Sequence, residues 1–290
     1  MPVNPSMPLP AYVTDLAQVV AQAVAEDLGS ADQTARLVPA GQTASARIIS
    51  REAAVICGRP WVDAVFAAID PAVQVEWLVA EGERVQPDQL LYRLHGSARS
   101  LLTGERTALN FLQSLSGTAT AVRQYVDAVA GTGTAIVDTR KTLPGLRNAQ
   151  KYAVLCGGGA NHRIGLYDGI LIKENHIAAA GSIAQAIAAA RALGAGVPLM
   201  TEAETLDEAR IALAENVDLL LVDEFSDADI REAVRLTRAH RAAGGKTLIE
   251  YSGGATLANI RALAETGVDR ISIGAITKHV RAVDLSMRFS

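Results

Sequence analysis

The sequence has few cysteines, no long apolar run and no excess of positive charge, and each absence excludes a class of protein. Its 290 residues include only Cys57 and Cys156, with no CxxC pair. A disulfide framework is therefore excluded, and a reducing compartment is expected. No apolar stretch reaches the roughly 18 residues that a membrane-spanning helix needs. The net charge of −4 argues against a general nucleic-acid-binding protein.

The N-terminus also lacks the features of a targeting signal. The segment MPVNPSMPLP contains no basic residue and is interrupted by prolines, which does not match a signal peptide and predicts a flexible tail over residues 1–10. We therefore expect a cytoplasmic protein that binds neither nucleic acid nor membrane. The length allows one large domain or two of ordinary size.

The first third of the chain predicts an α+β fold with antiparallel strands. Apolar residues at helical spacing indicate a helix between Tyr12 and Asp27. Residues 101–130 also have helical spacing, and Gly117 is expected to end one helix before a second begins at Ala119. This break places a domain boundary near residues 116–120. The strand-like segments are 44–51, 53–57, 73–79 and 89–94, with a short helix at 61–69.

After Gly131 the pattern changes to a repeat of strand, loop and helix. Each apolar strand stops abruptly at polar residues or glycine, as strands do at the functional edge of a parallel sheet. Six such units predict an incomplete (β/α) barrel with its site at the carboxyl ends of the strands. The candidate strands are 134–138, 169–172, 198–201, 218–222, 247–251 and 270–273, and the candidate helices are 182–193, 206–214, 227–242 and 256–265.

Cationic side chains follow two of these strands and the glycine-rich loop between them. Arg140 and Lys141 follow the first strand, Arg163 follows the loop at 157–159, and Lys173 follows the second strand. Any one of them fits ordinary surface charge equally well, and His162 alone fits a structural histidine better than a catalytic one. Together, at the mouth of a barrel, they favour a site for a small polyanion.

Two carboxylates and two glycine turns complete the candidate site. Glu202 and Asp223 end consecutive strands, where they either cap helices and pair with lysines or hold a divalent metal or the hydroxyls of a ribose. The turns 252–254 and 272–274 follow the last two strands, where barrels of this kind bind phosphate, although ordinary turns also use glycine. These residues suggest a phosphoribosyl pyrophosphate and an acidic co-substrate.

The central motifs resemble those of the quinolinate phosphoribosyltransferase family. They are DTRKTLPGLR at 138–147, KYAV at 151–154, GGG at 157–159, NHR at 161–163 and LIKENH at 171–176. Further matches occur at 26–29, at Glu105-Arg106 with Leu109-Asn110, at 252–254 and at 267–275. The resemblance therefore covers essentially the whole chain after the tail.

The resemblance implies a type II phosphoribosyltransferase-like fold in two domains. An N-terminal α/β sandwich is expected over residues 11–117. An open, six-stranded α/β barrel is expected over 118–290, with the last residues returning toward the N-terminal domain. The resemblance also implies a homodimer, with room for a larger assembly, in which Arg106 of one subunit reaches the site of its neighbour.

The resemblance further implies an activity, a cofactor and a role for each candidate residue. The reaction joins quinolinate to 5-phosphoribosyl 1-pyrophosphate with Mg²⁺, giving nicotinate mononucleotide, pyrophosphate and CO₂ in de novo NAD synthesis. The implied roles fall into three groups by ligand. Quinolinate meets Arg106, Thr139, Arg140, His162, Arg163 and Lys173; pyrophosphate, ribose and Mg²⁺ meet Lys141, Lys173, Glu202 and Asp223; the 5′-phosphate meets Ser252, Gly253, Gly254, Ile273, Gly274 and Ala275.

Two positions depart from the family pattern, and two other functions stay open. Glu224 stands where the family commonly has asparagine, and Met200 where many members have glutamate. The metal site is therefore less well defined than the cationic site for the carboxylates. One alternative is a related phosphoribosyltransferase, such as the molybdenum-operon relative or a non-decarboxylating nicotinate enzyme. The other is a non-catalytic phosphate or nucleotide sensor. Turnover of quinolinate with phosphoribosyl pyrophosphate distinguishes all of these.

Overall fold

The computed structural model describes residues 7–289 and divides the chain into two compact units. Unit 1 contains residues 1–123, 142–158 and 276–290, and unit 2 contains residues 124–141 and 159–275. Residues 1–6, which make up most of the tail predicted at 1–10, lie outside the described residues. Between residues 7 and 289, no helix is long and apolar enough to cross a membrane.

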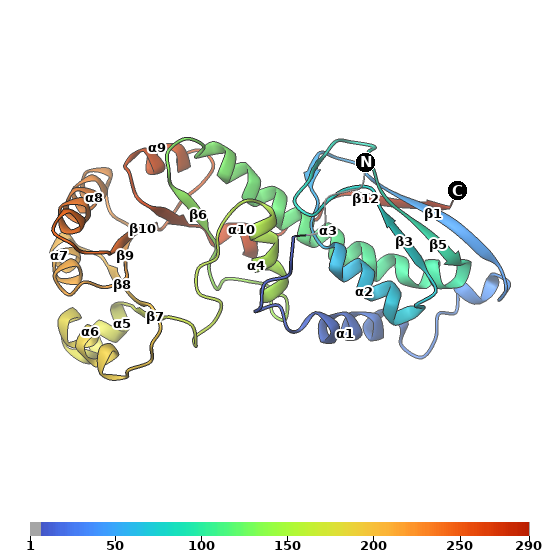
Figure 1. Cartoon of the computed structure of the whole chain (residues 1–290), viewed down its shortest axis with the longest axis horizontal. Coiled ribbons are helices and arrows are strands. Elements are labelled where there is room, and N and C mark those ends of the chain that lie inside the picture. The colour runs from blue at the N-terminus through green and yellow to red at the C-terminus, as the bar shows by residue number, and fades with distance from the viewer. Residues whose placement is uncertain (1–6, 290) are drawn as a thin grey trace. The chain divides into compact units, whose positions relative to one another are not determined.

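Unit 1 is built on a four-stranded antiparallel sheet with helices on one face (Figure 1). The strand order is β12-β1-β5-β3, so the last strand of the chain pairs with the first. A two-stranded ladder joins β2 and β4. The strands are β1 (Thr43–Ser50), β2 (Ala54–Val55), β3 (Gln74–Trp77), β4 (Arg84–Val85), β5 (Leu90–Ser97) and β12 (Leu285–Phe289). The helices are α1 (Leu16–Leu28), η1 (Ala35–Leu37), α2 (Arg59–Ile69), α4 (Arg147–Cys156) and α10 (Ala275–Lys278), with α3 (Ala98–Ala128).

The predicted helix break at Gly117 is wrong, because α3 runs without interruption from Ala98 to Ala128. A Cβ atom added at Gly117 would lie 2.1 Å from the carbonyl oxygen of Arg281. Glycine is therefore present to let a second segment of backbone approach the helix, and it does not end the helix. The sequence pattern missed this because the approaching segment is far away in the chain.

A buried carboxyl group joins the start of α2 to the core of unit 1. Glu81 Oε1 accepts hydrogen bonds from the backbone N–H groups of Gly58 at 2.9 Å and Arg59 at 3.0 Å, at the positively polarised end of the helix. The thiols of Cys57 and Cys156 lie beside it, and all three residues are buried. Burial raises the pKa of Glu81 to about 7, although these hydrogen bonds favour the charged form.

This raised pKa predicts a loss of stability as the pH rises. In the unfolded chain the carboxyl group ionises near pH 4.5, whereas in the folded chain it ionises near pH 7. Its contribution is therefore complete below the lower value and is lost as the pH rises through the higher one. We expect Glu81→Gln to remove a pH dependence of about 3 kcal/mol in the free energy of unfolding. Urea titrations of the wild type and the variant at pH 4.5 and pH 8 measure this change. An equal change in unfolding free energy between the two pH values in both proteins would contradict the assignment.

Unit 2 is an open barrel of six parallel strands, which confirms the predicted fold class. The strand order is β6-β11-β10-β9-β8-β7, so β6 and β7 are the two edge strands. The six predicted strands are confirmed, each within a few residues of its predicted limits. They are β6 (Ala135–Val137), β7 (Ile170–Ile172), β8 (Leu199–Ala203), β9 (Leu219–Asp223), β10 (Leu248–Ser252) and β11 (Arg270–Ser272).

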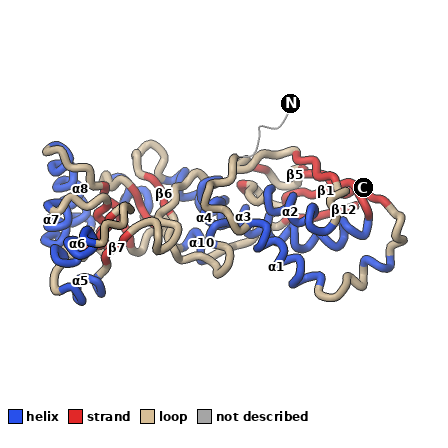
Figure 2. The backbone as a smooth tube through the Cα atoms, turned by 60° about the horizontal axis from the view of Figure 1, so that its bottom comes forward, coloured by secondary structure: helices blue, strands red, loops and turns tan. Residues whose placement is uncertain are grey.

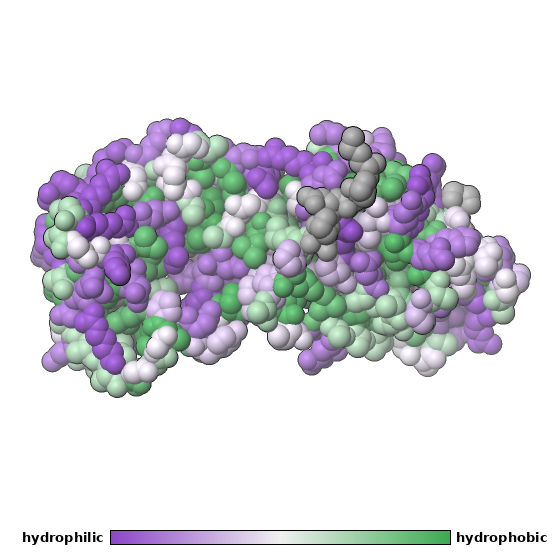
Figure 3. Space-filling view, viewed as in Figure 1, coloured by the Kyte–Doolittle hydropathy of each residue, from purple (hydrophilic) through white to green (hydrophobic). Residues whose placement is uncertain are grey.

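The helices of unit 2 follow the strands and cover the outer side of the sheet. In Figure 1, α7 and α8 lie outside β8 and β9, and Figure 2 shows α6, α7 and α8 grouped on one side of the strands of this unit. The surface over α8, which has many charged residues, is mainly hydrophilic, whereas that over the alanine-rich α6 is paler (Figure 3). The helices are α5 (Glu174–Ala180), α6 (Ile183–Ala192), α7 (Leu206–Ala214), α8 (Asp227–Ala242) and α9 (Ile260–Glu265).

Candidate active site

The carboxyl ends of the barrel strands surround a cavity of about 340 Å³. All the residues that line it belong to unit 2. Four of them are cations and one is a buried carboxylate, so the cavity is strongly polar. The lining residues are Thr139, Arg140, Lys141, His162, Arg163, Leu171, Lys173, Leu221, Glu250, Ser252 and Ser272.

The structure therefore brings together most of the cationic residues that the sequence singled out. Arg140 and Lys141 come from the end of β6, and Lys173 comes from the end of β7. Since β6 and β7 are the edge strands of the open barrel, these cations approach the cavity from both edges of the sheet. A cavity lined in this way suits a ligand with several negative groups.

A buried aspartate holds the loop that carries the NHR motif. Asp138, directly after β6, accepts a hydrogen bond from the His162 backbone N–H at 2.9 Å and one from Asn161 Nδ2 at 2.7 Å. Ala160 also makes a parallel bridge with Val137. The loop is thus attached to the end of β6 by its backbone and by a side chain. This attachment directs the next two side chains into the cavity.

Arg163 occupies a site that is partly removed from water and crowded by another cation. Its Nη1 donates a hydrogen bond to the Gly169 carbonyl oxygen at 2.9 Å. Burial lowers its pKa, and the positive charge of Arg140 lowers it further, while Asp168 opposes both. Two guanidinium groups held near each other in this way favour an anion between them.

The second predicted group, Glu202 with Asp223, also lies at this edge of the sheet. Glu202 Oε2 lies 2.5 Å from Lys173 Nζ, and β8 and β9 are paired neighbours. Burial raises the pKa of Glu202 and the adjacent Asp223 raises it further, whereas Lys173 opposes them. The two carboxyl groups therefore lie near each other at the ends of neighbouring strands.

The glycine turn after β10 is shaped around Asp223. Gly253 has a φ of 105°, and a Cβ atom there would lie 2.9 Å from Asp223 Oδ1. Only glycine adopts this backbone while leaving room for the carboxylate. Glu224 also has a positive φ, 54°, a conformation that asparagine tolerates better than glutamate. At this position, glutamate in place of asparagine therefore makes the backbone conformation beside the site less favourable.

Some predicted residues lie outside the set that lines the cavity. Glu202 and Asp223 lie beside it without lining it, and the rest of the turns after β10 and β11, namely Gly253, Gly254, Ile273, Gly274 and Ala275, are also outside the lining set. Arg106 is an exposed residue of α3 in unit 1. Met200 is buried in β8.

Three lining residues were not predicted from the sequence, and Glu250 is the most informative of them. Glu250 is completely buried in the middle of β10, and its Oε2 accepts a hydrogen bond from Arg270 Nε at 2.5 Å. An acidic residue inside an apolar strand was the available signal. Leu171 and Leu221 gave no such signal, because they match the ordinary pattern of a strand.

An open parallel barrel with cations and paired carboxylates at its mouth defines an anion-binding α/β-barrel protein. Comparison with known proteins gives the family. The model for the quinolinate phosphoribosyl transferase C-terminal domain matches residues 118–288, and the model for the N-terminal domain matches residues 32–116. The chain belongs to the quinolinate phosphoribosyltransferase family.

Relatives of similar length support this assignment. A nicotinate-nucleotide pyrophosphorylase [carboxylating] of Mycobacterium leprae is 42% identical, over 92% of this chain and 95% of its own. A probable enzyme of the same name from Synechocystis sp. is 42% identical, over 92% and 90%. The solved structure of the nicotinate-nucleotide pyrophosphorylase from Francisella tularensis is 43% identical, with a TM-score of 0.90 and coverage of 95% and 96%.

Proposed function

We propose that this chain transfers the phosphoribosyl group of 5-phosphoribosyl 1-pyrophosphate to quinolinate and releases CO₂. The products are nicotinate mononucleotide and pyrophosphate, as in de novo NAD synthesis. The family assignment and the names of the relatives, read in the reverse direction, support this reaction. The observation that carries it is the cavity at the barrel mouth, where four cations lie next to a pair of carboxyl groups.

The cationic wall binds the pyridine substrate. Quinolinate carries two adjacent carboxylates, and Arg140, Arg163 and Lys173 supply the matching positive charges around one cavity. Guanidinium groups form paired hydrogen bonds to carboxylates, so they orient the ring as well as attract it. Thr139 and His162 add further hydrogen-bonding groups to the same wall. The ring nitrogen is thereby placed for attack on the sugar.

The sugar phosphate binds across the other strand ends. Lys141 meets the pyrophosphate, Glu202 and Asp223 face the ribose, and the turns after β10 and β11 hold the 5′-phosphate. The carboxylates stabilise the positive charge that develops on the anomeric carbon as its bond to pyrophosphate loosens. The backbone of Gly253 and Gly254, both with positive φ, allows close approach to a phosphate.

The donor set at β8 and β9 fits the Mg²⁺ that the family implies. Glu202 and Asp223 offer carboxylate oxygens, the ligands that Mg²⁺ takes together with substrate phosphate. Burial and the nearby Asp223 raise the pKa of Glu202, and a divalent cation would offset the repulsion between the two carboxylates. When bound, Mg²⁺ would neutralise charge on the leaving pyrophosphate.

Decarboxylation follows from the first step and needs no further cofactor. Bond formation between the ring nitrogen and the ribose makes the pyridine ring cationic. The positive ring then stabilises the electron pair left at C2 when the 2-carboxylate departs as CO₂, and a proton takes its place. The contribution of the protein is to hold both substrates in position and to balance their charge.

We also propose that the active enzyme is a cytoplasmic homodimer in which Arg106 acts in the site of the partner. Arg106 is exposed on α3 and is not among the described residues that line the cavity. An exposed arginine is suited to a carboxylate that comes from outside its own unit. The two buried free cysteines fit a reducing compartment.

Shared sites predict recovery of activity from two inactive proteins. We expect Arg106→Ala and Lys173→Ala each to reduce turnover strongly, because each removes a cation for quinolinate. In a mixed dimer one of the two sites lacks both defects. After unfolding and refolding an equal mixture, about a quarter of wild-type activity should return. No recovery in dimers shown to contain both chains would contradict the shared site.

The experiment for the proposed function compares two acceptors and two modes of action. The protein is incubated with phosphoribosyl pyrophosphate, Mg²⁺ and either quinolinate or nicotinate, and nicotinate mononucleotide is measured. The proposal predicts product from quinolinate and a much slower reaction with nicotinate. Product from nicotinate alone indicates the non-decarboxylating enzyme. Binding of phosphoribosyl pyrophosphate without product from either acceptor indicates a sensor and overturns the proposal.

A further inference from the structure

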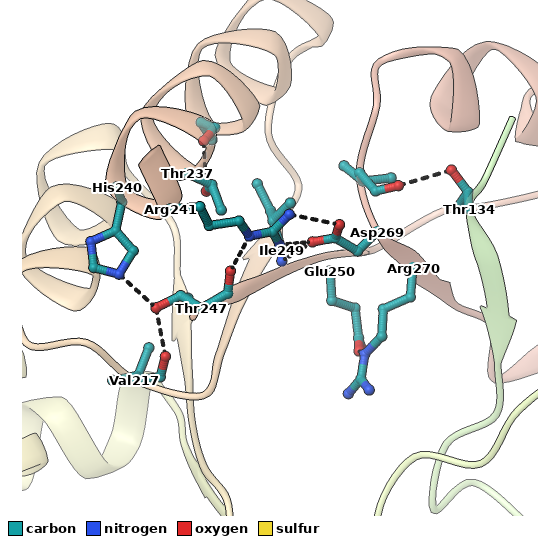
Figure 4. A network of polar contacts seen from close by, with 12 residues as sticks. Thr134, Val217, Thr237, His240, Arg241, Thr247, Ile249, Glu250, Asp269 and Arg270 are labelled. Carbon is teal, nitrogen blue, oxygen red and sulfur yellow. Dashed lines mark hydrogen bonds and ion pairs between the residues drawn. The ribbon is translucent and has the colours of Figure 1, made fainter. Parts of the chain in front are cut away.

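Glu250, a buried residue that lines the cavity, forms an ion pair with Arg270 on the next strand. Glu250 on β10 lies directly opposite Arg270 on β11, and both side chains point away from the α8 side of the sheet (Figure 4). Arg270 Nε donates to Glu250 Oε2 at 2.5 Å. The other carboxylate oxygen, Oε1, is buried and has no hydrogen-bond partner among the described residues. A buried oxygen left in this way is costly unless it serves a nearby group.

The imidazole of His162 faces this oxygen. Its Nε2 lies 3.6 Å from Glu250 Oε1, and the side chains are 7% and 0% exposed. On the other side of the ring, the Arg163 backbone N–H donates to His162 Nδ1 at 2.7 Å. An N–H can donate only to a nitrogen that carries a lone pair, so Nδ1 is unprotonated. The ring proton is therefore on Nε2, the nitrogen that faces the carboxylate.

From these contacts we infer that Glu250 is a positioning residue, which holds His162 as the neutral Nε2–H tautomer in the quinolinate site. The expected effect on kinetics rests on the proposed function, whereas the assignment of the tautomer does not. Arg270 holds the Glu250 carboxylate in place, and this carboxylate faces the Nε2 edge of the His162 ring. Asp138, through the His162 backbone, fixes the loop.

A neutral histidine has a specific value at this cavity. The wall already holds Arg140, Lys141, Arg163 and Lys173, and Arg163 is destabilised by the charge of Arg140. A further cation would increase that repulsion. A neutral N–H donor orients the substrate carboxylate through a hydrogen bond without adding a positive charge. It also binds a carboxylate less strongly than an ion pair would, which matters because one substrate carboxylate must lose its charge as CO₂ departs.

The kinetic test compares a substitution in β10 with one at the residue that directly precedes β11. Glu250→Gln removes the charge on the cavity side, and Asp269→Asn removes one on the opposite side, where Asp269 pairs with Arg241 (Figure 4). We expect Glu250→Gln to raise KM for quinolinate about tenfold, as removal of a supporting partner does, with KM for phosphoribosyl pyrophosphate nearly unchanged. Asp269→Asn should leave both KM values unchanged while lowering Tm.

A double-mutant cycle separates action through His162 from a direct contact. If Glu250 acts by positioning the ring, Glu250→Gln should change KM less than twofold in a His162→Gln background. Equal effects in both backgrounds would overturn the inference. No change in KM with a lowered Tm would also overturn it, because Glu250 would then be purely structural.

NMR of the ligand-free protein tests the tautomer without any activity. With ¹⁵N-labelled histidine, the signals of His162 are assigned by their loss in His162→Gln. The inference predicts an unprotonated Nδ1 and a protonated Nε2 in the wild type, and exchange between tautomers in Glu250→Gln. A protonated Nδ1 in the wild type would overturn it. If the tautomer is confirmed but quinolinate is not turned over, the proposed function fails and the positioning role stands.

Discussion

Lys173→Ala is expected to lower kcat/KM for quinolinate by about 10²–10³-fold, the loss found when one preorganised charge-stabilising group is removed from an active site. The cavity loses the cation that follows β7. The neighbouring strand β8 contributes no cationic residue to the described lining of the cavity. Glu202 also loses the partner that lies 2.5 Å away and that opposes the rise in its pKa caused by burial and by Asp223. Release of CO₂ from quinolinate at saturating phosphoribosyl pyrophosphate measures the effect.

A second lysine provides the control for this prediction. Lys246 is exposed in the loop between α8 and β10 and is absent from the cavity wall. Lys246→Ala removes the same charge from the protein and should leave kcat/KM within twofold of wild type. Activity of Lys173→Ala within a factor of three of wild type would show that the cavity at the barrel mouth is not where quinolinate binds.

Asp138→Asn is expected to lower activity about 100-fold through the position of the loop that carries His162 and Arg163. An amide at position 138 presents a donor to Asn161 Nδ2, where the carboxylate accepts a hydrogen bond at 2.7 Å. Two donors then face each other in a buried site, at a cost of about 2 kcal/mol in unfolding free energy. Steady-state kinetics and urea unfolding measure the two effects.

The reciprocal substitution gives a direct check on the cause. In the double variant Asp138→Asn with Asn161→Asp, the donor and the acceptor exchange places, so the hydrogen bond can form again. We expect the double variant to recover most of the lost stability and at least tenfold of the activity. If the second substitution only adds to the first defect, the bond between these two side chains does not hold the loop.

The barrel was predictable from the sequence because its signals are local. Each of the six strands is a short apolar run that ends at a charge or a glycine, and the helices between them have regular spacing. The end of each strand then places its polar residues at one edge of the sheet. The sequence alone therefore assigns Arg140, Lys141, Lys173 and Asp223 to a common edge of the sheet.

The features that escaped prediction depend on contacts between distant parts of the chain. Gly117 reads as a helix break until the Arg281 backbone is seen against it. Glu250 looks like an exception within a strand until Arg270 and His162 are placed beside it. The orientation of the His162 ring depends on a backbone N–H, which no residue pattern records.

The central claim is that one cavity holds quinolinate beside an activated sugar phosphate, so that transfer precedes loss of the carboxylate. The most direct measurement uses quinolinate labelled in the 2-carboxylate and follows labelled CO₂ and pyrophosphate together. We expect CO₂ to appear only when phosphoribosyl pyrophosphate is present, and in an amount equal to that of pyrophosphate. Release of CO₂ without the sugar phosphate, or pyrophosphate without CO₂, would contradict it.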